Sequence, residues 1–240
     1  MYNIRVRFIR GEEVKFISHL DLMKVFERAL RRTGLPISYS QGFNPHPQMV
    51  FGLPLSVGVT SEAEYADFEL SQEVNPAEYI EKLNTGLPPG IRIMEAAVRK
   101  TKENIMATIA GAGYEITAFL KESPELADMS ERVSHFMNNN NIIVRKEGKG
   151  GVKDIDIKPM ILKLDVAPVM QIPPGYEEFG SAFRFTALLR AGSVANLRPE
   201  LLIRALSGDT GFDLGVCRVH RSRLFVEKDG KFSDPMDEVV

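Results

Sequence analysis

The sequence contains one cysteine, Cys217, among 240 residues. A single cysteine excludes an internal disulfide framework, and by itself it cannot hold an iron–sulfur cluster or a structural zinc, which need three or four suitable ligands. A chain without disulfides is typical of a reducing compartment, so we expect a cytoplasmic protein. Cys217 itself is predicted to be a small apolar residue of a strand.

Long apolar runs are also missing. No stretch approaches the roughly 18 uninterrupted apolar residues of a membrane-spanning helix, and the N-terminus, MYNIRVRFIRGEEVKF, is charged throughout. We therefore expect neither a membrane span nor a secretion signal. The net charge of −2 provides no overall attraction for nucleic acid, so a nucleic-acid function would need a local basic patch.

The common phosphate-binding, dinucleotide-binding and metal-binding motifs are absent as well, including GxGxxG, HExxH and paired CxxC. We predict no cofactor and no metal site. One pair of carboxylates leaves an alternative open: Asp154 and Asp156 share one face of a predicted strand and could bind a cation. We favour the simpler explanation, in which the two carboxylates occupy exposed strand positions beside the buried Ile155 and Ile157.

What is present is a pattern of strands and helices that occurs twice. Residues 2–10 alternate between apolar side chains and Asn3, Arg5 and Arg7, which predicts a half-buried strand. A helix is predicted to begin at Ser18, whose spacing to Asp21 is that of a capping box, and to end at Gly34. The remaining strands are expected at 37–39, 48–57, 63–70, 91–98, 106–120, 142–146, 155–166, 182–190 and 216–227, and the remaining helices after Asn75, at 124–138 and from Pro199.

The repeated order predicts an α+β fold of two ferredoxin-like (split βαβ) units in tandem, each with an antiparallel sheet and its helices on one face. The second helices of the two halves are even alike locally, NPAEYIEKL and RPELLIRAL. Chance similarity between two ordinary α+β units is the alternative. We place the first unit at residues 1–103 and the second at 104–240, and the two could pack as one body. Such sheets host many unrelated functions, so the fold alone does not select one.

Ser18, His19 and Asp21 invite a catalytic interpretation that geometry disfavours. Consecutive positions at a helix start do not face each other, and the serine hydroxyl is the natural cap of the helix. Close to the positive end of a helix dipole, His19 favours a neutral imidazole. We therefore predict that these residues bind a partner, and we assign no catalytic residue.

The stretch SYSQGFNPHPQMVFG, residues 38–52, predicts a stiff loop. Gly42 permits a positive φ, and Asn44 and His46 each precede a proline, which biases them toward extended geometry. A stiff loop loses little entropy when it presents a side chain to a ligand. His46 is either such a contact residue or only the exposed tip of a turn.

Two groups of basic residues stand out against the neutral whole. Residues 1–60 carry a net charge of +4, and Arg28, Arg31 and Arg32 form a flank of the first helix. The second group, on the last predicted strand, comprises Arg218, His220, Arg221 and Arg223. Together the groups could line a groove that contacts phosphates; a solvated charged face is the alternative.

The motifs FISHLDLMKVFERALRRTGLPISYSQGFNPHP and SEAEY together resemble the radical-SAM-linked family of bacterial proteins, a domain of unknown function. The resemblance is dense over roughly residues 1–100 and thins to IDIKP, RPELLIRAL and VHR in the second half. The resemblance implies that the protein is encoded beside, or fused behind, a radical SAM protein that has a B12-binding-like region. The positions that match the family's motifs are Phe16, Ser18, His19, Asp21, Glu27, Arg28, Arg31, Arg32, Tyr39, Ser40, Gly42, Phe43, Pro45, His46 and Pro47.

The chain lacks the CxxxCxxC cluster motif of radical SAM enzymes, so we expect it to be a stand-alone partner of such an enzyme. Our leading hypothesis is a non-catalytic accessory binding protein that contacts RNA, either tRNA or rRNA. The predicted contact residues are Ser18, His19, Asp21, Arg28, Arg31, Arg32, Tyr39, Gly42, Phe43, Asn44, His46 and Arg221. The alternatives are an enzyme that uses His46 as an acid–base group and an adaptor that binds only proteins.

Overall fold

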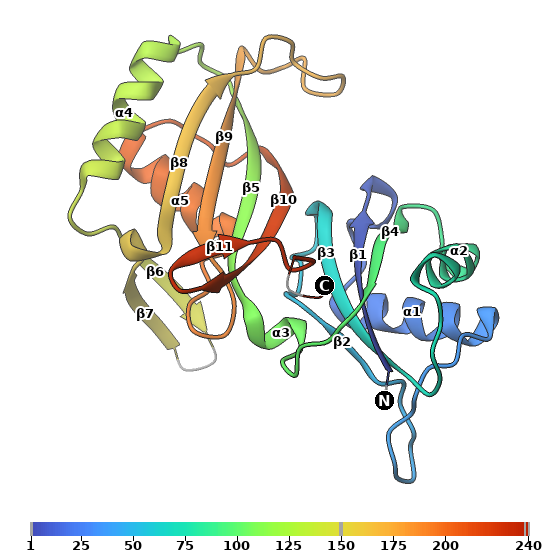
Figure 1. Cartoon of the computed structure of the whole chain (residues 1–240). Helices are drawn as coiled ribbons and strands as arrows, with labels where there is room; N and C mark the ends of the chain where they lie inside the picture. Colours follow the sequence, from blue (N-terminus) through green and yellow to red (C-terminus); the bar gives the residue numbers. More distant parts are fainter. Residues whose placement is uncertain (1, 149–150, 238, 240) are drawn as a thin grey trace. The chain divides into compact units, whose positions relative to one another are not determined.

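The computed structural model describes residues 2–148, 151–237 and 239 (Figure 1). It is a mixed α+β structure whose strands pair mostly antiparallel. The chain divides into two compact units: unit 1 comprises Met1–Gly111 and Arg221–Val240, and unit 2 comprises Ala112–His220. Each unit is described separately below.

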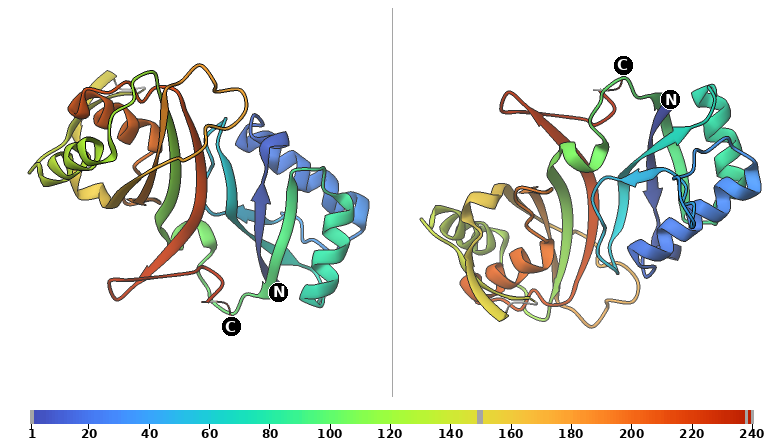
Figure 2. Two further views of the ribbon diagram at one scale, coloured as in Figure 1. Left: turned by 90° about the horizontal axis from the view of Figure 1, so that it is seen from above. Right: turned by 90° about the horizontal axis from the view of Figure 1, so that it is seen from below.

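Unit 1 is a sheet covered by two helices. The strand order is β4-β1-β3, and β1 pairs antiparallel with both neighbours. The short strand β2 pairs with β3, and β11 pairs with β10. Figure 2 shows both long helices on the same face of this sheet. The elements are β1 (Tyr2–Arg10), η1 (Glu12–Val14), α1 (His19–Thr33), β2 (Met49–Phe51), β3 (Thr60–Leu70), α2 (Pro76–Gly86), β4 (Ile91–Val98), α3 (Ile105–Thr108) and β11 (Lys231–Ser233).

Unit 2 follows a similar plan with the order β5-β9-β8, and its helices also lie on one face of the sheet (Figure 2). β6 and β7 form a separate two-stranded sheet. Two strands, β5 and β10, have residues in both units. The elements are β5 (Ile109–Leu120), α4 (Leu126–Asn138), β6 (Ile143–Gly148), β7 (Gly151–Asp156), η2 (Lys158–Met160), β8 (Ile161–Pro168), β9 (Ser181–Arg190), α5 (Pro199–Thr210) and β10 (Cys217–Lys228).

The aromatic core of unit 1 fixes α1 against the sheet. Phe8 on β1, Phe26 on α1 and Phe68 on β3 have no exposed surface, and Phe51 on β2 is 5% exposed. The Phe8 and Phe26 rings meet edge to face with centroids 5.0 Å apart, and the Phe26 and Phe51 rings meet at 5.2 Å. Such pairs contribute about 0.5–1.5 kcal/mol beyond their buried area. The N-terminal part of α1 is thereby held over the strands that carry the candidate site.

The predicted ends of α1 are confirmed. Ser18 is the N-cap, and its hydroxyl accepts a hydrogen bond from the backbone N–H of Asp21 at 3.1 Å. Gly34 ends the helix in the left-handed conformation, with φ of 64°. Asn75 likewise caps α2, where Pro76 occupies the first turn. In each case the local chemistry that marks a helix end is independent of the rest of the fold.

Several predicted strands differ from the structure. Residues 37–39 form only isolated bridges, and the strand expected at 48–57 is limited to Met49–Phe51. The strand expected from Met106 begins as the helical turn α3, because the Asn104 side chain accepts a hydrogen bond from the N–H of Ala107. The strand expected at 155–166 is divided by η2, which contains a proline near its start. Short apolar runs do not distinguish these outcomes, because their periodicity is the same in each case.

The boundary between the two units also differs from the predicted one, which lay between residues 103 and 104. The boundary lies a few residues later, between Gly111 and Ala112, and Arg221–Val240 clusters with unit 1. This return of the chain depends on pairings with distant residues, such as the hydrogen bond from the Ser61 hydroxyl to the backbone oxygen of Arg221. Local sequence carries no signal for such pairings. Among the described helices, none is long and apolar enough to cross a membrane.

Candidate functional site

A buried group of charged residues lies in unit 1 where β1 ends and α1 begins. We call Arg10, His19, Glu64 and Arg221 the Arg10 cluster. Arg10 has no exposed surface, Arg221 is 2% exposed and Glu64 is 4% exposed, while His19 is partly exposed. Charged side chains are almost never this buried unless they are paired or serve a function. The cluster is therefore the candidate site.

Arg221 and Glu64 form an ion pair within the cluster. Nη1 of Arg221 donates to Oε1 of Glu64 at 2.9 Å and to the backbone oxygen of Leu53 at 3.0 Å. Nη2 of Arg221 donates to the backbone oxygen of Pro54 at 3.2 Å. These contacts tie β10 to β3 and to the loop after β2. The sequence predicted that Arg221 contacts phosphates in a groove or lies on a solvated face; the structure instead buries it, because Glu64 supplies a partner on the neighbouring strand.

Arg10 differs from Arg221 because much of its hydrogen-bonding capacity is unused. Nη2 of Arg10 donates to the backbone oxygens of Ile17 at 3.1 Å and Val14 at 3.5 Å. Nε and Nη1 are buried and have no hydrogen-bond partner among the residues that the structure describes. Burial lowers the pKa of Arg10, an effect that the nearby Arg221 charge reinforces and the Glu64 charge opposes. An arginine remains charged even so, and the cluster therefore contains a buried cation with two unused donors.

His19 forms the more exposed side of the cluster. It is the first residue of α1, and its ring meets the Phe51 ring edge to face with centroids 5.7 Å apart. Burial and the positive charge of Arg10 lower the pKa of His19, and the opposing effect of Glu64 is smaller. The imidazole is therefore neutral at pH 7, and one ring nitrogen is free to accept a hydrogen bond.

The structure separates His19 from its neighbours in the predicted set. Ser18 and Asp21 bond each other, with the Ser18 hydroxyl donating to Oδ2 of Asp21 at 2.7 Å. That hydrogen bond lowers the pKa of Asp21, whose side chain faces solvent. Together the two residues form the cap of α1. Their place in the motif is accounted for by helix initiation.

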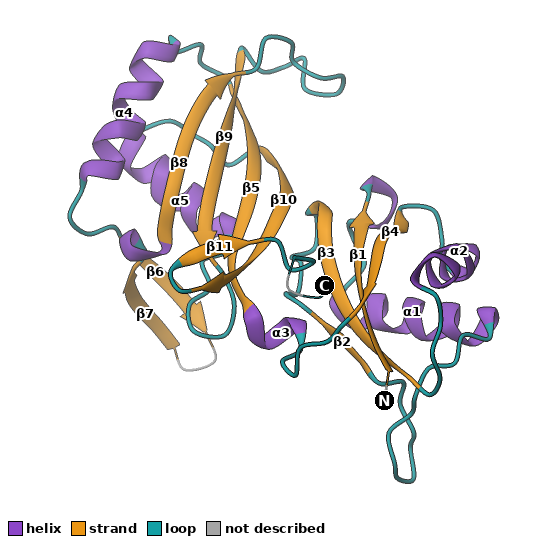
Figure 3. Ribbon diagram, in the orientation of Figure 1, coloured by secondary structure: helices purple, strands orange, loops and turns teal. Residues whose placement is uncertain are grey.

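The predicted loop projects from unit 1 between α1 and β2 (Figures 1 and 3). We call residues 40–47 the Phe43 loop, because the Phe43 side chain at its tip is fully exposed. The loop is closed at its base by two hydrogen bonds between the same two residues. Ser40 N–H donates to the backbone oxygen of His46 at 2.9 Å, and His46 N–H donates to the Ser40 hydroxyl at 3.0 Å. Gly42 has φ of 132°, a conformation that disfavours other residues.

Tyr39, Asn44 and His46 are exposed together with Phe43. Tyr39 pairs with Pro47 through an isolated bridge, which continues the closure of the loop toward unit 1. Within the described residues, no hydrogen bond reaches the imidazole of His46, and no hydrogen bond or ring contact joins it to His19. The two histidines of the motif thus belong to different surroundings.

The predicted arginines of α1 lie on its outer face. Arg28, Arg31 and Arg32 are all exposed. Arg31 pairs with Glu27 at 3.0 Å, and Arg32 donates to the backbone oxygen of Gly86 at the end of α2. Arg28 makes no hydrogen bond or ion pair with the residues that the structure describes. These side chains are available to a ligand, since exposed ion pairs of this kind are worth only a few tenths of a kcal/mol to about 1 kcal/mol.

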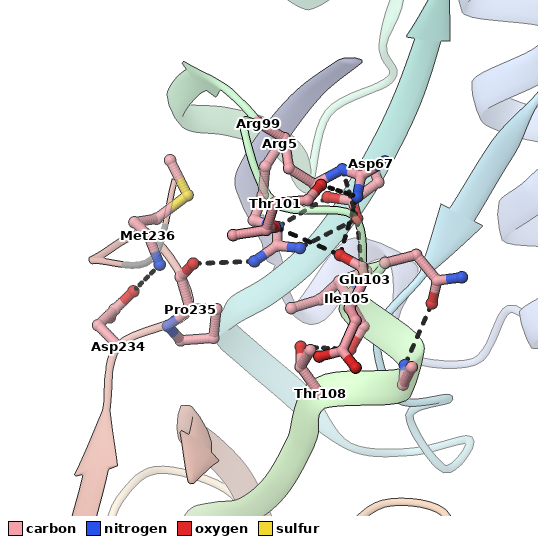
Figure 4. A network of polar contacts seen from close by, with 12 residues as sticks. Arg5, Asp67, Arg99, Thr101, Glu103, Ile105, Thr108, Asp234, Pro235 and Met236 are labelled. Atoms are coloured by element: carbon pink, nitrogen blue, oxygen red, sulfur yellow. Dashed lines mark hydrogen bonds and ion pairs between the residues drawn. The ribbon is translucent and has the colours of Figure 1, made fainter. Parts of the chain in front are cut away.

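A second buried network of charged residues lies in unit 1, and in it Arg5 and Asp67 find their partners within the protein (Figure 4). The Asp67 carboxylate accepts from Nε and Nη2 of Arg5 at 2.7 and 3.1 Å and from the N–H of Ile105 at 2.8 Å. Nη1 of Arg5 donates to the backbone oxygen of Pro235 at 3.0 Å. Arg99 lies 3.4 Å from the same carboxylate. Strand alternation predicted Arg5 on an open face, but the network buries it completely.

The carboxylates proposed as a possible cation site are engaged by the protein. Asp154 lies 3.6 Å from Arg145, and Asp156 accepts from Asn141 and from the N–H groups of Ile142 and Lys158. The hydrogen bond from the Ile142 N–H contributes most to lowering the pKa of Asp156. Across the part of the chain that the structure describes, no three His, Cys, Asp or Glu side chains gather as a metal site would require.

Arg10 and Glu64 are the site residues that sequence analysis missed. Glu64 lies within the SEAEY motif, and Arg10 ends an alternating strand. Neither was singled out as a site residue, because an isolated sequence shows neither burial nor the distant partner. The sequence did contain one signal, the alternation of side chains along the strand. By that alternation Arg10 falls on the same side of β1 as Val6 and Phe8, which is the apolar face.

Comparison with known proteins gives a family and loose resemblances to solved structures. A family model described as "Uncharacterized protein conserved in bacteria (DUF2344)" matches residues 3–199. No curated protein matches the sequence. A chain of the "Crystal Structure of a Cbf5-Nop10-Gar1 Complex" is 13% identical with a TM-score of 0.44, and the match covers 93% of this chain and 47% of that chain. A TM-score this low carries neither fold nor function across.

Proposed function

The chain belongs to the family described as uncharacterized proteins conserved in bacteria (DUF2344), and we propose that it is a non-catalytic binding protein that contacts RNA and works with a radical SAM enzyme. The RNA would be tRNA or rRNA, bound by the Phe43 loop and the outer face of α1. The radical SAM partner is proposed from the motif resemblance alone.

We further propose that each unit is a ferredoxin-like unit. In unit 1 the strand pairing runs β4-β1-β3-β2, and in unit 2 it runs β10-β5-β9-β8. Both follow the order fourth-first-third-second that a split βαβ unit produces, with a helix after its first and third strands. The shared order supports duplication of one unit.

The Phe43 ring carries the RNA proposal. An aromatic side chain that is fully exposed on a closed, stiff loop is costly to leave in water and is already positioned for a ligand. Nucleobases stack on such rings without regard to sequence, and each stacked base is worth about 1–3 kcal/mol. Arg28 and Arg31 on α1 supply exposed cations for the phosphates of the same strand.

The surroundings of His46 favour RNA binding over an acid–base role for this residue. A general base needs a neighbouring group that orients its imidazole. The His46 ring has no such hydrogen bond among the described residues, and it is exposed, as are Phe43 and Asn44 of the same loop. We therefore favour presentation of a ligand by His46 over catalysis.

A binding titration with fluorescently labelled single-stranded RNA at several salt concentrations tests the proposal. We expect Phe43→Ala to weaken binding by about 1–3 kcal/mol because a stacking surface is removed. Arg31→Ala should weaken binding and reduce the salt slope by about one unit. Matched controls are Met170→Ala, which removes a side chain that is 93% exposed in unit 2, and Lys82→Ala, which removes an exposed cation of α2.

The proposal is wrong if the wild-type protein binds no RNA at low salt, or if the controls weaken binding as much as the test variants do. Co-purification with the radical SAM protein, with and without nuclease, tests the remaining alternative, an adaptor that binds only proteins. Capture of that protein that depends on Phe43 but not on RNA would overturn RNA binding in favour of a protein-only adaptor.

A further inference from the structure

The unused donors of Arg10 have a physical cost. A buried polar group that lacks a hydrogen bond costs about 1–3 kcal/mol, and more when the group is charged. Arg10 has two such nitrogens, Nε and Nη1, on a side chain with no exposed surface. Arg5 on the same strand is equally buried, yet all three of its nitrogens donate to Asp67 or Pro235. The fold can therefore supply hydrogen-bond acceptors to every nitrogen of a buried arginine on β1. At Arg10 it leaves two nitrogens that can donate to a further group.

The surroundings of Arg10 favour a negatively charged group. The charge of Glu64 acts on Arg10, but the Glu64 carboxylate accepts a hydrogen bond from Arg221 and, among the described residues, none from Arg10. Nη2 of Arg10 donates to the carbonyl oxygens of Val14 and Ile17, and Ile17 directly precedes Ser18, the N-cap of the 15-residue helix α1. The positive end of that helix dipole adds to the field of the guanidinium. Hydrogen bonds from a charged donor to an anion are about twice as strong as neutral ones.

We propose that the Arg10 cluster binds a small oxyanion of the phosphate type, which accepts from Nε and Nη1 of Arg10. His19 is the most exposed member of the cluster, so the ligand reaches Arg10 on that side and receives or donates a hydrogen bond at the imidazole. This site is separate from the Phe43 loop and does not rest on RNA binding. Its test can therefore succeed or fail independently of the proposed function.

The probe is inorganic phosphate, compared with chloride at the same ionic strength and pH. Thermal unfolding of the full chain is followed at increasing phosphate concentration, and binding is measured directly by titration calorimetry. We expect the unfolding midpoint to rise to a plateau with phosphate but not with chloride, because a ligand that binds only the native state stabilises it. Arg10→Gln should weaken phosphate binding about tenfold or more, since it removes the charge-assisted hydrogen bonds.

Arg5→Gln is the matched control, because it removes an equally buried arginine of β1 from a complete network. It should lower stability while leaving the response to phosphate unchanged. If neither variant folds, the wild-type protein alone decides the outcome. A phosphate response no larger than that of chloride overturns the proposal and leaves ordered water as the partner of Arg10.

Discussion

At the scale of single residues, burial distinguishes side chains that the sequence presents as equivalent. Arg5 and Arg10 lie on one strand and are both fully buried, but only Arg5 has a carboxylate of its own. Arg31 and Arg221 are both basic motif residues, yet one is exposed and the other is 2% exposed. Charge alone therefore did not identify the site; the partner of each charge did.

His19 gives the first residue-scale prediction. Its pKa in the folded protein is lowered by burial and by Arg10, so the unfolded chain binds the proton more readily. Stability from the neutral imidazole is complete above the unfolded pKa of about 6.5 and is lost as the pH falls below that value. We expect His19→Gln to lose less stability than the wild type between pH 7.5 and 5.5, measured by urea denaturation.

His135 provides the control for this experiment, because its side chain is 74% exposed on α4. His135→Gln removes one imidazole and leaves the Arg10 cluster intact, so it shows the effect of losing a histidine outside the cluster. An identical pH dependence in wild type and His19→Gln would contradict the lowered pKa.

At the scale of elements, helix ends follow from local chemistry, while helix contacts do not. The cap residues Ser18 and Asn75 and the terminal Gly34 were recognised from type and spacing. The contact between α1 and α2 has no such signature. It depends on Gly86 at the end of α2, whose missing side chain allows the helix to approach Ala29 and Thr33.

Two glycines in helices make this packing testable. A Cβ at Gly86 would lie 2.8 Å from Cγ2 of Thr33 and 3.0 Å from the backbone oxygen of Ala29, so Gly86→Ala should destabilise the protein by about 1–3 kcal/mol. A Cβ at Gly208 in α5 meets nothing within 4 Å. Gly208→Ala should therefore stabilise by about 0.5–1 kcal/mol through helix propensity. Equal effects of the two substitutions in chemical denaturation would contradict the close approach.

At the scale of the whole molecule, unit 1 is completed by residues from the far end of the chain. The carboxylate of Asp67 joins β1 and β3 to the segment that leads into α3, and Arg5 extends the network to Pro235 (Figure 4). The Tyr65 hydroxyl adds a hydrogen bond to Asp234 at 3.0 Å. Burial, with the Asp234 charge, raises the pKa of Tyr65 well above its usual value, so this hydroxyl remains a donor.

Removal of Asp67 should therefore affect the whole unit. Asp67→Ala leaves the buried Arg5 without its counter-charge, which costs about 3–5 kcal/mol. Glu95→Ala is the control, because its ion pair with Arg7 is partly exposed and worth less than about 1 kcal/mol. Hydrogen exchange of β1 and β3 amides provides the measurement. Similar losses for the two variants would mean that the network does not support unit 1.

The sequence by itself determined the α+β class, the ends of β1, α1 and β4 and the bacterial family, because caps, alternation and motifs are properties of neighbouring residues. It also predicted the Phe43 loop, whose stiffness resides in its own glycine and prolines. Tertiary structure alone decided that Arg221 is buried, that Arg10 keeps unused donors and that the chain returns to unit 1 after unit 2. Those features depend on which residues lie together across more than a hundred positions, and no local pattern records such distances.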